Sequence, residues 1–186
     1  MIAVGGTALA ALIGLPMGFL AASNVAPPWL SQGMKFFLGF LRSIPLIVVA
    51  ILFVTAVGLG PFPGALAIAF HSIGMLGKFY AEEFETAEEG IVNAVAGTGA
   101  GWLQTVRWGL FPQSVPQVVA FTVYRLEMNF RDAAVLGLVG AGGIGYYIQL
   151  YVRGFQYEKV AVLLAVIIVV VTVLDQLTYW ARRWVR

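Results

Sequence analysis

Long apolar runs interrupted by one polar segment constrain the fold of this 186-residue chain more than any other feature. Residues 82–117 hold five of the 9 acidic residues and several glycines, whereas the flanking runs are strongly apolar. The segment is too polar to lie in lipid and too long and regular for a simple linker. We interpret it as the place where a soluble partner binds.

The composition indicates a membrane protein. Apolar residues make up 60% of the chain and charged residues only 11%, whereas a soluble domain has about 25% charged residues. A hydrocarbon core about 30 Å thick needs roughly 20 apolar residues per helix. The apolar runs predict an all-α polytopic membrane protein with about five helices, forming a single domain over residues 1–186. The predicted spans cover residues 2–22, 36–57, 65–80, a fourth from residue 115 into 136–145, and 160–179.

Several chemistries are excluded. The chain has no cysteine and one histidine, His71, so it lacks the ligands of an ordinary metal site and the groups of a membrane enzyme. We expect His71 to pack or to form a hydrogen bond near a helix. The net charge of +2 is too small to indicate a nucleic-acid partner.

Basic residues predict the orientation, because Lys and Arg are enriched on the cytoplasmic side. With five alternating spans, three basic regions share one side, which places the polar segment in the cytoplasm. The N-terminus would then start outside, so we expect a further helix upstream. The three regions are Lys35 with Arg42, Lys78 with Arg107, and the tail of Arg182, Arg183 and Arg186.

Within the polar segment, residues 91–98 and 102–109 predict two short helices, with glycines between them providing the turn. Asn93 is a possible cap, Pro112 is expected to end the second helix, and Pro116 to open the next span. Spacing alone favours neither of two interpretations. The hairpin could bind a partner, or it could be an interfacial amphipathic hairpin without one.

The segment resembles the EAA loop of bacterial ABC importer permeases. Ala94, Gly99 and Pro112 match at the family spacing, whereas Asn93 and Val95 stand where the family usually has Glu and Ala. The residues expected to couple to an ATPase are Asn93, Ala94, Val95, Gly99, Ala100, Leu110 and Pro112.

Stretches along most of the chain are similar to phosphonate-type permeases: residues 42–45, 58–61, 77–85 and 124–145. The resemblance implies a type I (MetI-like) transmembrane domain in the bacterial plasma (inner) membrane, with residues 82–114 as its cytoplasmic coupling loop. It also implies a second permease copy, two ATPase subunits and an extracytoplasmic phosphonate-binding protein. ATP and Mg²⁺ would bind the partner ATPase, so no cofactor is expected here, and the sequence contains no GxxxxGK[ST] motif.

Charged residues inside the fourth span are costly, at about 2.5–3.5 kcal/mol each at the bilayer centre. They should therefore face protein or water. Glu127 and Arg131 are spaced to pair on a helix. Two interpretations stay open: an ion-pair network that fixes helix packing, or a path in which Arg125 or Arg131 offers charge to a passing anion. The candidate path residues are Arg125, Glu127, Asn129, Arg131, Asp132, Ser43, Gly142 and Gly143.

The glycine-rich stretch at residues 136–145 predicts close helix packing with a contribution to gating. The best-supported function is a permease for phosphonate or a related phosphorus oxyanion, working by ATP-driven alternating access. The alternatives are a permease for another small substrate, such as phosphite or an amino acid, and an ion-coupled secondary transporter.

Overall fold

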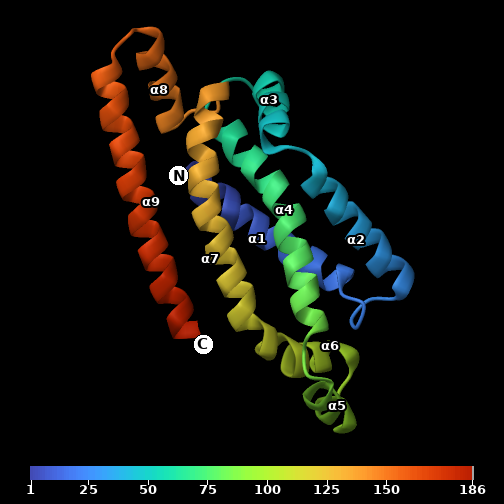
Figure 1. Cartoon of the computed structure of the whole chain (residues 1–186). Coiled ribbons are helices and arrows are strands. Elements are labelled where there is room, and N and C mark those ends of the chain that lie inside the picture. The colour runs from blue at the N-terminus through green and yellow to red at the C-terminus, as the bar shows by residue number, and fades with distance from the viewer. Residues whose placement is uncertain (186) are drawn as a thin grey trace.

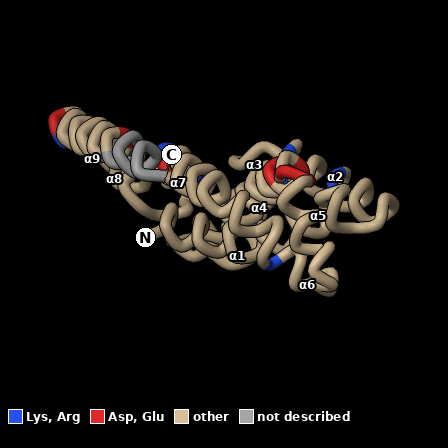
Figure 2. The backbone as a smooth tube through the Cα atoms, turned by 90° about the horizontal axis from the view of Figure 1, so that it is seen from below, with Lys and Arg blue, Asp and Glu red and all other residues tan. Residues whose placement is uncertain are grey.

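The computed structural model describes residues 1–185, with side chains through residue 176. Four helical segments form a layer: α9 (Tyr157–Val185), α7 (Phe111–Leu136), α4 (Pro61–Glu85), and the pair α2 (Pro28–Ser43) and α3 (Leu46–Val57). The first helix, α1 (Ile2–Ala21), crosses behind this layer (Figures 1 and 2). The described chain is helical throughout, which confirms the predicted all-α architecture.

The predicted number of about five spans agrees with the structure if two bent helix pairs each count as one span. Among the described residues, 3 helices are long and apolar enough to cross a membrane: α1, α4 and the Tyr157–Gln176 part of α9. Two bent pairs raise the number to 5 if each pair is one span. One pair is α2 with α3, and the other joins Trp102–Val139 to α8 (Ile144–Arg153).

The second predicted span, residues 36–57, is wrong as a continuous helix. The chain bends by 81° between α2 and α3. Ile44 and Pro45 have extended backbones, with ψ of 122° and 135°. Proline disfavours the helical conformation of the residue before it, and it lacks the N–H that would continue the α2 hydrogen bonds.

The polar segment between the long helices is shorter than predicted. Helix α4 continues to Glu85 because three donors hold its last turn. The Glu85 Oε1 atom accepts from the backbone N–H and the hydroxyl of Ser23, both at 2.7 Å, and from Lys35 Nζ at 2.6 Å. The predicted end of this span at residue 80 was therefore too early.

Three expectations about the ends of helices are also wrong. Pro112 does not end the second short helix, because α6 (Trp102–Thr105) continues through a π-helical turn, η1 (Val106–Leu110), directly into α7. Pro112 is the second residue of α7, directly after the π-helical turn, and Pro116 lies inside that helix. Asn93 lies within α5 (Glu89–Gly97), whose N-cap is Glu88.

Close backbone contact between α1 and α4 forms the centre of the bundle. A Cβ atom on Gly18 would lie 2.8 Å from the Tyr80 Cβ, and one on Gly14 would lie 3.4 Å from the Gly77 nitrogen. Small residues allow helix axes to approach in this way inside lipid. Tyr80 and Phe84 are fully buried at this contact.

The glycine-rich stretch packs as predicted. It contains η2 (Gly137–Val139) and the start of α8. A Cβ on Gly145 would overlap the backbone carbonyl of Ala134, and Gly145 lies directly against Gly137. The residues that follow it, 146–153, are helical in α8.

The predicted orientation requires the hairpin and the C-terminal end of the last helix to lie at the same end of the bundle (Figure 1). The α5–α6 hairpin and the C-terminal end of α9 lie at one end, and the α8–α9 turn lies at the other. Arg42 is an exception. Its backbone lies against Gly74 in the middle of α4, so it does not mark the hairpin end. The side chains of Arg182, Arg183 and Arg186 lie outside the described residues.

Candidate functional site

Residues 89–110 form a helical hairpin beyond the end of the bundle (Figure 1). Gly99, with φ of 83°, makes the turn after α5. The Gln104 side chain accepts a 3.0 Å hydrogen bond from the Gly101 N–H and so fixes the start of α6. The two arms then meet at Gly109, where an added Cβ would lie 3.3 Å from the Val92 Cα.

The base of the hairpin is tied to the bundle. Leu110 is buried in a cluster with Phe84 of α4, and Phe19 and Val92 pack against that cluster. The Gln113 side chain accepts from the Glu88 N–H at 3.0 Å and donates to the Gly109 carbonyl. The base of the hairpin is therefore in direct contact with α4 and α7.

The tip of the hairpin exposes large apolar side chains. Trp102, Leu103 and Trp108 are 62%, 70% and 65% exposed, and Ile91 is also exposed. The Arg107 guanidinium lies 5.5 Å from the centre of the Trp108 ring. Apolar side chains gathered on a segment outside the bundle indicate a protein-binding surface.

The predicted coupling residues lie along this hairpin. Asn93, Ala94 and Gly99 are exposed, whereas Val95 and Ala100 are half-buried against the second arm or the turn. Leu110 is buried in the anchoring cluster. Pro112 is exposed in the first turn of α7. Sequence reasoning did not single out the exposed apolar side chains as the contact surface, although their residue types were visible.

The second candidate region is a polar network inside the bundle, centred on Arg125. This side chain is only 4% exposed. Its Nε donates to Ser72 Oγ at 3.0 Å, and its Nη1 contacts the Met75 sulfur at 3.4 Å. Its Nη2 lies 3.5 Å from Asp132 Oδ2. The carboxylate compensates the buried charge, which would otherwise be strongly destabilising.

Asn129, one turn along α7, joins three helices. Its amide donates to Thr7 Oγ1 on α1 at 2.7 Å and to Ser72 Oγ on α4 at 3.1 Å. The predicted group Arg125, Asn129 and Asp132 is thus brought together. Thr7 and Ser72 complete the network. The sequence did not single them out, because an isolated hydroxyl residue in an apolar run often bonds only the backbone of its own helix.

Arg131 is part of a different contact. Its Nη2 lies 2.7 Å from Glu127 Oε1 and 2.9 Å from Asp175 Oδ1 on α9. The predicted pair of Glu127 and Arg131 is confirmed. The third member, Asp175, comes from the last span and could not be assigned from spacing.

Two buried polar atoms among the described side chains have no hydrogen-bond partner: His71 Nδ1 and Arg125 Nη2. Leaving such a group unsatisfied costs about 1–3 kcal/mol. His71 lies on α4 close to Ser72 and Met75, which both contact Arg125. Sequence reasoning gave His71 no place in the candidate path.

The remaining predicted path residues lie apart from this network. The Ser43 hydroxyl donates to the Phe40 carbonyl of its own helix at 2.8 Å. Gly142 and Gly143, with φ of 74° and 76°, lie before α8. An added Cβ on Gly142 would meet Pro61 at the start of α4, at 3.1 Å.

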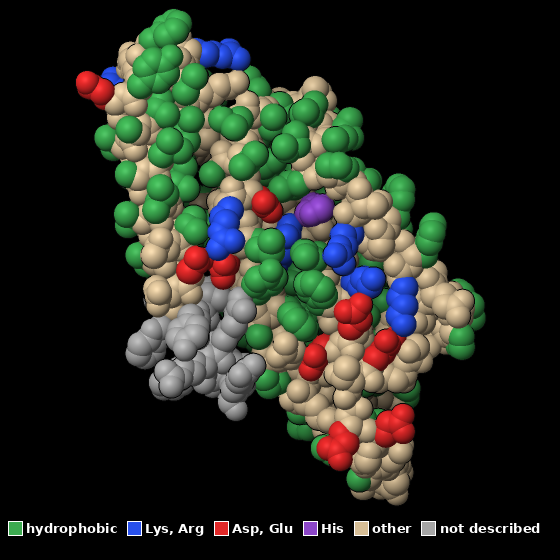
Figure 3. Space-filling model, in the orientation of Figure 1, with side chains coloured by type: hydrophobic (Ala, Val, Ile, Leu, Met, Phe, Trp, Pro, Cys, Tyr) green, Lys and Arg blue, Asp and Glu red, His purple; other side chains and the backbone are tan. Residues whose placement is uncertain are grey.

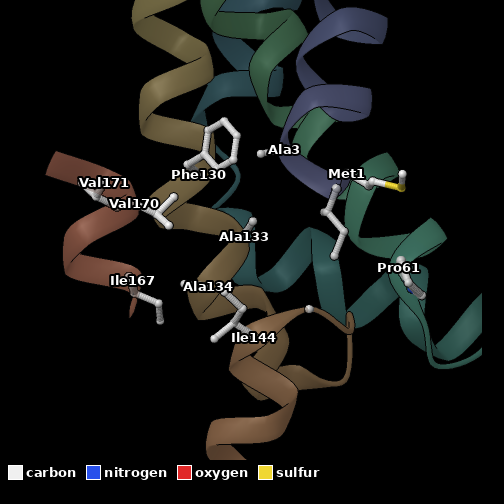
Figure 4. Close-up of a pocket in the computed structure, with 12 residues that line it drawn as sticks. Met1, Ala3, Pro61, Phe130, Ala133, Ala134, Ile144, Ile167, Val170 and Val171 are labelled. Atoms are coloured by element: carbon white, nitrogen blue, oxygen red, sulfur yellow. The ribbon is translucent and has the colours of Figure 1, made fainter. Parts of the chain in front are cut away.

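Gly143 also borders a cavity of about 290 Å³ between the start of α1 and helices α7, α8 and α9 (Figure 4). The walls are apolar and include Ile2, Phe130, Ile144 and Ile167. Such walls offer no donor to an anion, so the cavity is a poor candidate for an anion site.

One face of the bundle carries a group of charged side chains. Figure 3 shows acidic and basic side chains and the single histidine on the face opposite α1, over α2, α4, α7 and α9. Charged groups at membrane depth avoid lipid. This face is therefore suited to protein or water contact.

The family match covers most of the chain. Residues 14–186 match the family described as the inner membrane component of binding-protein-dependent transport systems. The chain belongs to this family. It is accordingly a multi-pass inner membrane component of a binding-protein-dependent transport system.

Its relatives include permeases for phosphorus compounds. The phosphite transport system permease protein of Stutzerimonas stutzeri is 43% identical over 92% of this chain and 63% of its own length. The phosphate-import permease protein of Mycolicibacterium smegmatis is 41% identical over 98% of this chain and 35% of its own length. The chain therefore spans less than two thirds of the length of these relatives.

The fold is that of a solved importer. A chain of the methionine ABC transporter MetNI, in an inward-facing conformation, superposes with a TM-score of 0.85. The match covers 100% of this chain and 91% of the other at 21% identity. At this identity the likeness shows the fold alone, and it confirms the predicted MetI-like architecture.

Proposed function

We propose that this chain is the translocation subunit of an ATP-driven importer for phosphorus oxyanions, a class that includes phosphonate, phosphite and phosphate. The observation that carries the proposal is the buried guanidinium of Arg125, whose ion-pair partner Asp132 is partly exposed. The relatives named for phosphite and phosphate support the substrate class.

The charged face would line the path between two copies of the chain. A buried guanidinium attracts an oxyanion and can bind two of its oxygens. The nearby carboxylate weakens this attraction, and a transporter needs weak binding so that the substrate can leave. Asn129 belongs to this path as its fixed wall, and Gly142 and Gly143 lie at the far end, where helices α4 and α8 meet.

The hairpin would bind one of two cytoplasmic ATPase subunits, which carry ATP and Mg²⁺. An extracytoplasmic binding protein would deliver the substrate, and the assembly would sit in the lipid bilayer. The exposed Trp102, Leu103 and Trp108 supply the contact surface. The anchors at Leu110 and Gln113 carry the motion of the ATPase into α4 and α7, in a rigid-body change of the kind known for switching proteins.

The test combines assembly and uptake. The complete transporter is expressed, and uptake of labelled phosphite, phosphate and methylphosphonate is measured with and without residues 93–109 of this chain. We expect the deletion to abolish both co-purification with the ATPase and ATP-coupled uptake. Uptake that survives the deletion would favour a secondary transporter instead and overturn the proposal.

A further inference from the structure

The two unpartnered buried nitrogens, His71 Nδ1 and Arg125 Nη2, are on facing helices, α4 and α7. Buried polar groups nearly always have a partner, and an exception calls for a specific explanation. In a transport protein, one explanation is a ligand that binds during part of the cycle. The surroundings of both atoms support this explanation.

The Arg125 side chain is held in a fixed direction. Nε is bound by Ser72 and Nη1 by the Met75 sulfur, both on α4. These two residues lie one and four positions after His71, so the guanidinium lies along the same face of α4. The charges of Arg125 and Asp132 both act on His71, which places the three groups in one neighbourhood. Nη2 is the donor left facing Asp132.

The imidazole of His71 lies beside the Ile44 backbone, and its Nδ1 has no partner. In the neutral ring with its proton on Nε2, Nδ1 is an acceptor. The site therefore presents one donor with positive charge and one acceptor.

We propose that Arg125 Nη2 and His71 Nδ1 together bind a singly protonated phosphorus oxyanion, an inference that rests on the importer function above. Nη2 donates to an unprotonated oxygen on phosphorus, and Nδ1 accepts from the P–OH group. Phosphite, phosphate and alkylphosphonates all have such a form. Sulfate is also tetrahedral, but at neutral pH it has no proton to donate, so the acceptor would be left facing an oxygen.

Asp132 is the group that the oxyanion would displace. Its side chain is 34% exposed, whereas Arg125 is 4% exposed, so the carboxylate is the more accessible member of the pair. The contact to Nη2 is an ion pair at 3.5 Å without hydrogen-bond geometry. An incoming oxyanion can replace it, and the return of Asp132 would promote release.

The test uses the purified transporter complex in lipid nanodiscs without its binding protein. Binding of sodium phosphite is followed by ³¹P NMR line broadening, and sodium sulfate is added as a competitor. We compare His71→Ala and Asp132→Asn with Thr55→Ala, which removes an exposed hydroxyl on α3 bonded to its own helix. Binding-protein-stimulated ATP hydrolysis checks that each variant is assembled.

We expect His71→Ala to weaken phosphite binding by about tenfold, because the hydrogen bond from the P–OH group to Nδ1 is lost. Asp132→Asn should tighten binding several-fold and slow uptake, an outcome that misfolding cannot mimic. Sulfate should not compete, and Thr55→Ala should bind like the unaltered chain.

Unchanged phosphite binding in His71→Ala, weaker binding in Asp132→Asn, or effective competition by sulfate would each overturn the site and leave the importer function intact. A transporter whose unaltered form takes up no phosphite, phosphate or phosphonate would overturn both.

Discussion

Asn129 shows how one residue can determine the packing of three helices. It is fully buried, and its amide bonds hydroxyl groups on α1 and α4. Ser72 also bonds Arg125 through its hydroxyl. Buried polar networks of this kind are stabilising when every member is satisfied and costly when one is removed.

We predict that Asn129→Ala lowers the stability of the assembled protein by about 1–3 kcal/mol, because it removes bonds from Ser72 and Thr7 and leaves Arg125 less well held. Thermal unfolding of the purified complex in detergent measures the effect. Thr55→Ala is the matched control and should change stability by less than about 0.5 kcal/mol. Equal effects of the two substitutions would show that the network does not stabilise the bundle.

Arg131 poses a separate question, because it bonds both Glu127 on its own helix and Asp175 on α9. We predict a coupling of about 1 kcal/mol between Arg131→Gln and Asp175→Asn in a double-mutant cycle of thermal stability, as for partly exposed pairs.

Uptake separates the two roles proposed for Arg131. If it only joins α7 to α9, the two single variants should transport equally well at matched expression. A path role predicts that Arg131→Gln lowers phosphonate uptake while Asp175→Asn does not. Normal uptake by Arg131→Gln would exclude the path role for this residue.

At the scale of elements, close backbone contacts determine which helices can be neighbours. Gly137 and Gly145 allow η2 and α8 to fold back against the end of α7, and α8 then continues to the turn before α9. Gly14 and Gly18 act in the same way between α1 and α4. An added Cβ at Gly18, Gly137 or Gly145 would require movement of the backbone or of a packed neighbour, whereas at Gly14 it would make an ordinary contact with Gly77.

We predict that Gly145→Ala destabilises the protein by about 1–3 kcal/mol, because its methyl group would overlap the Ala134 carbonyl and must displace α8. Gly39→Ala in α2 is the control, since nothing lies within 4 Å of the added methyl group. Alanine favours a helix more than glycine by up to about 1 kcal/mol. The melting temperatures of the two variants should therefore move in opposite directions.

At the scale of the whole molecule, the hairpin and the charged face lie on a continuous path of contacts. The hairpin base is packed on Phe84 of α4 and runs into α7. The same two helices carry His71, Ser72, Arg125 and Asn129 farther along. A displacement of the hairpin by a partner would shift α4 and α7 together or apart, and would change the distance between His71 and Arg125.

We predict that Trp102→Ala weakens co-purification with the ATPase by about thirtyfold, the effect of losing one buried aromatic contact at a protein interface. Phe36→Ala on α2 removes a side chain that is 79% exposed and lies outside the hairpin, and should leave co-purification unchanged. An equal loss in both variants would place the ATPase contact elsewhere.

The sequence by itself determined the membrane class, most of the spans and the position of the hairpin. These properties depend on local patterns: apolar runs of sufficient length, a polar break, and glycines at the turn near Gly99. The motif match around Ala94 and Pro112 added the family, which residues 14–186 confirmed.

Only the tertiary structure decided which polar side chains meet. Thr7, Ser72 and Asn129 are distant in sequence, and Asp175 reaches Arg131 only because α9 packs beside α7. The break at Pro45 and the continuation through Pro112 also depended on context, because proline either interrupts a helix or starts one, depending on its position. The sequence places a charge in the membrane, but the packing of distant helices decides what compensates it.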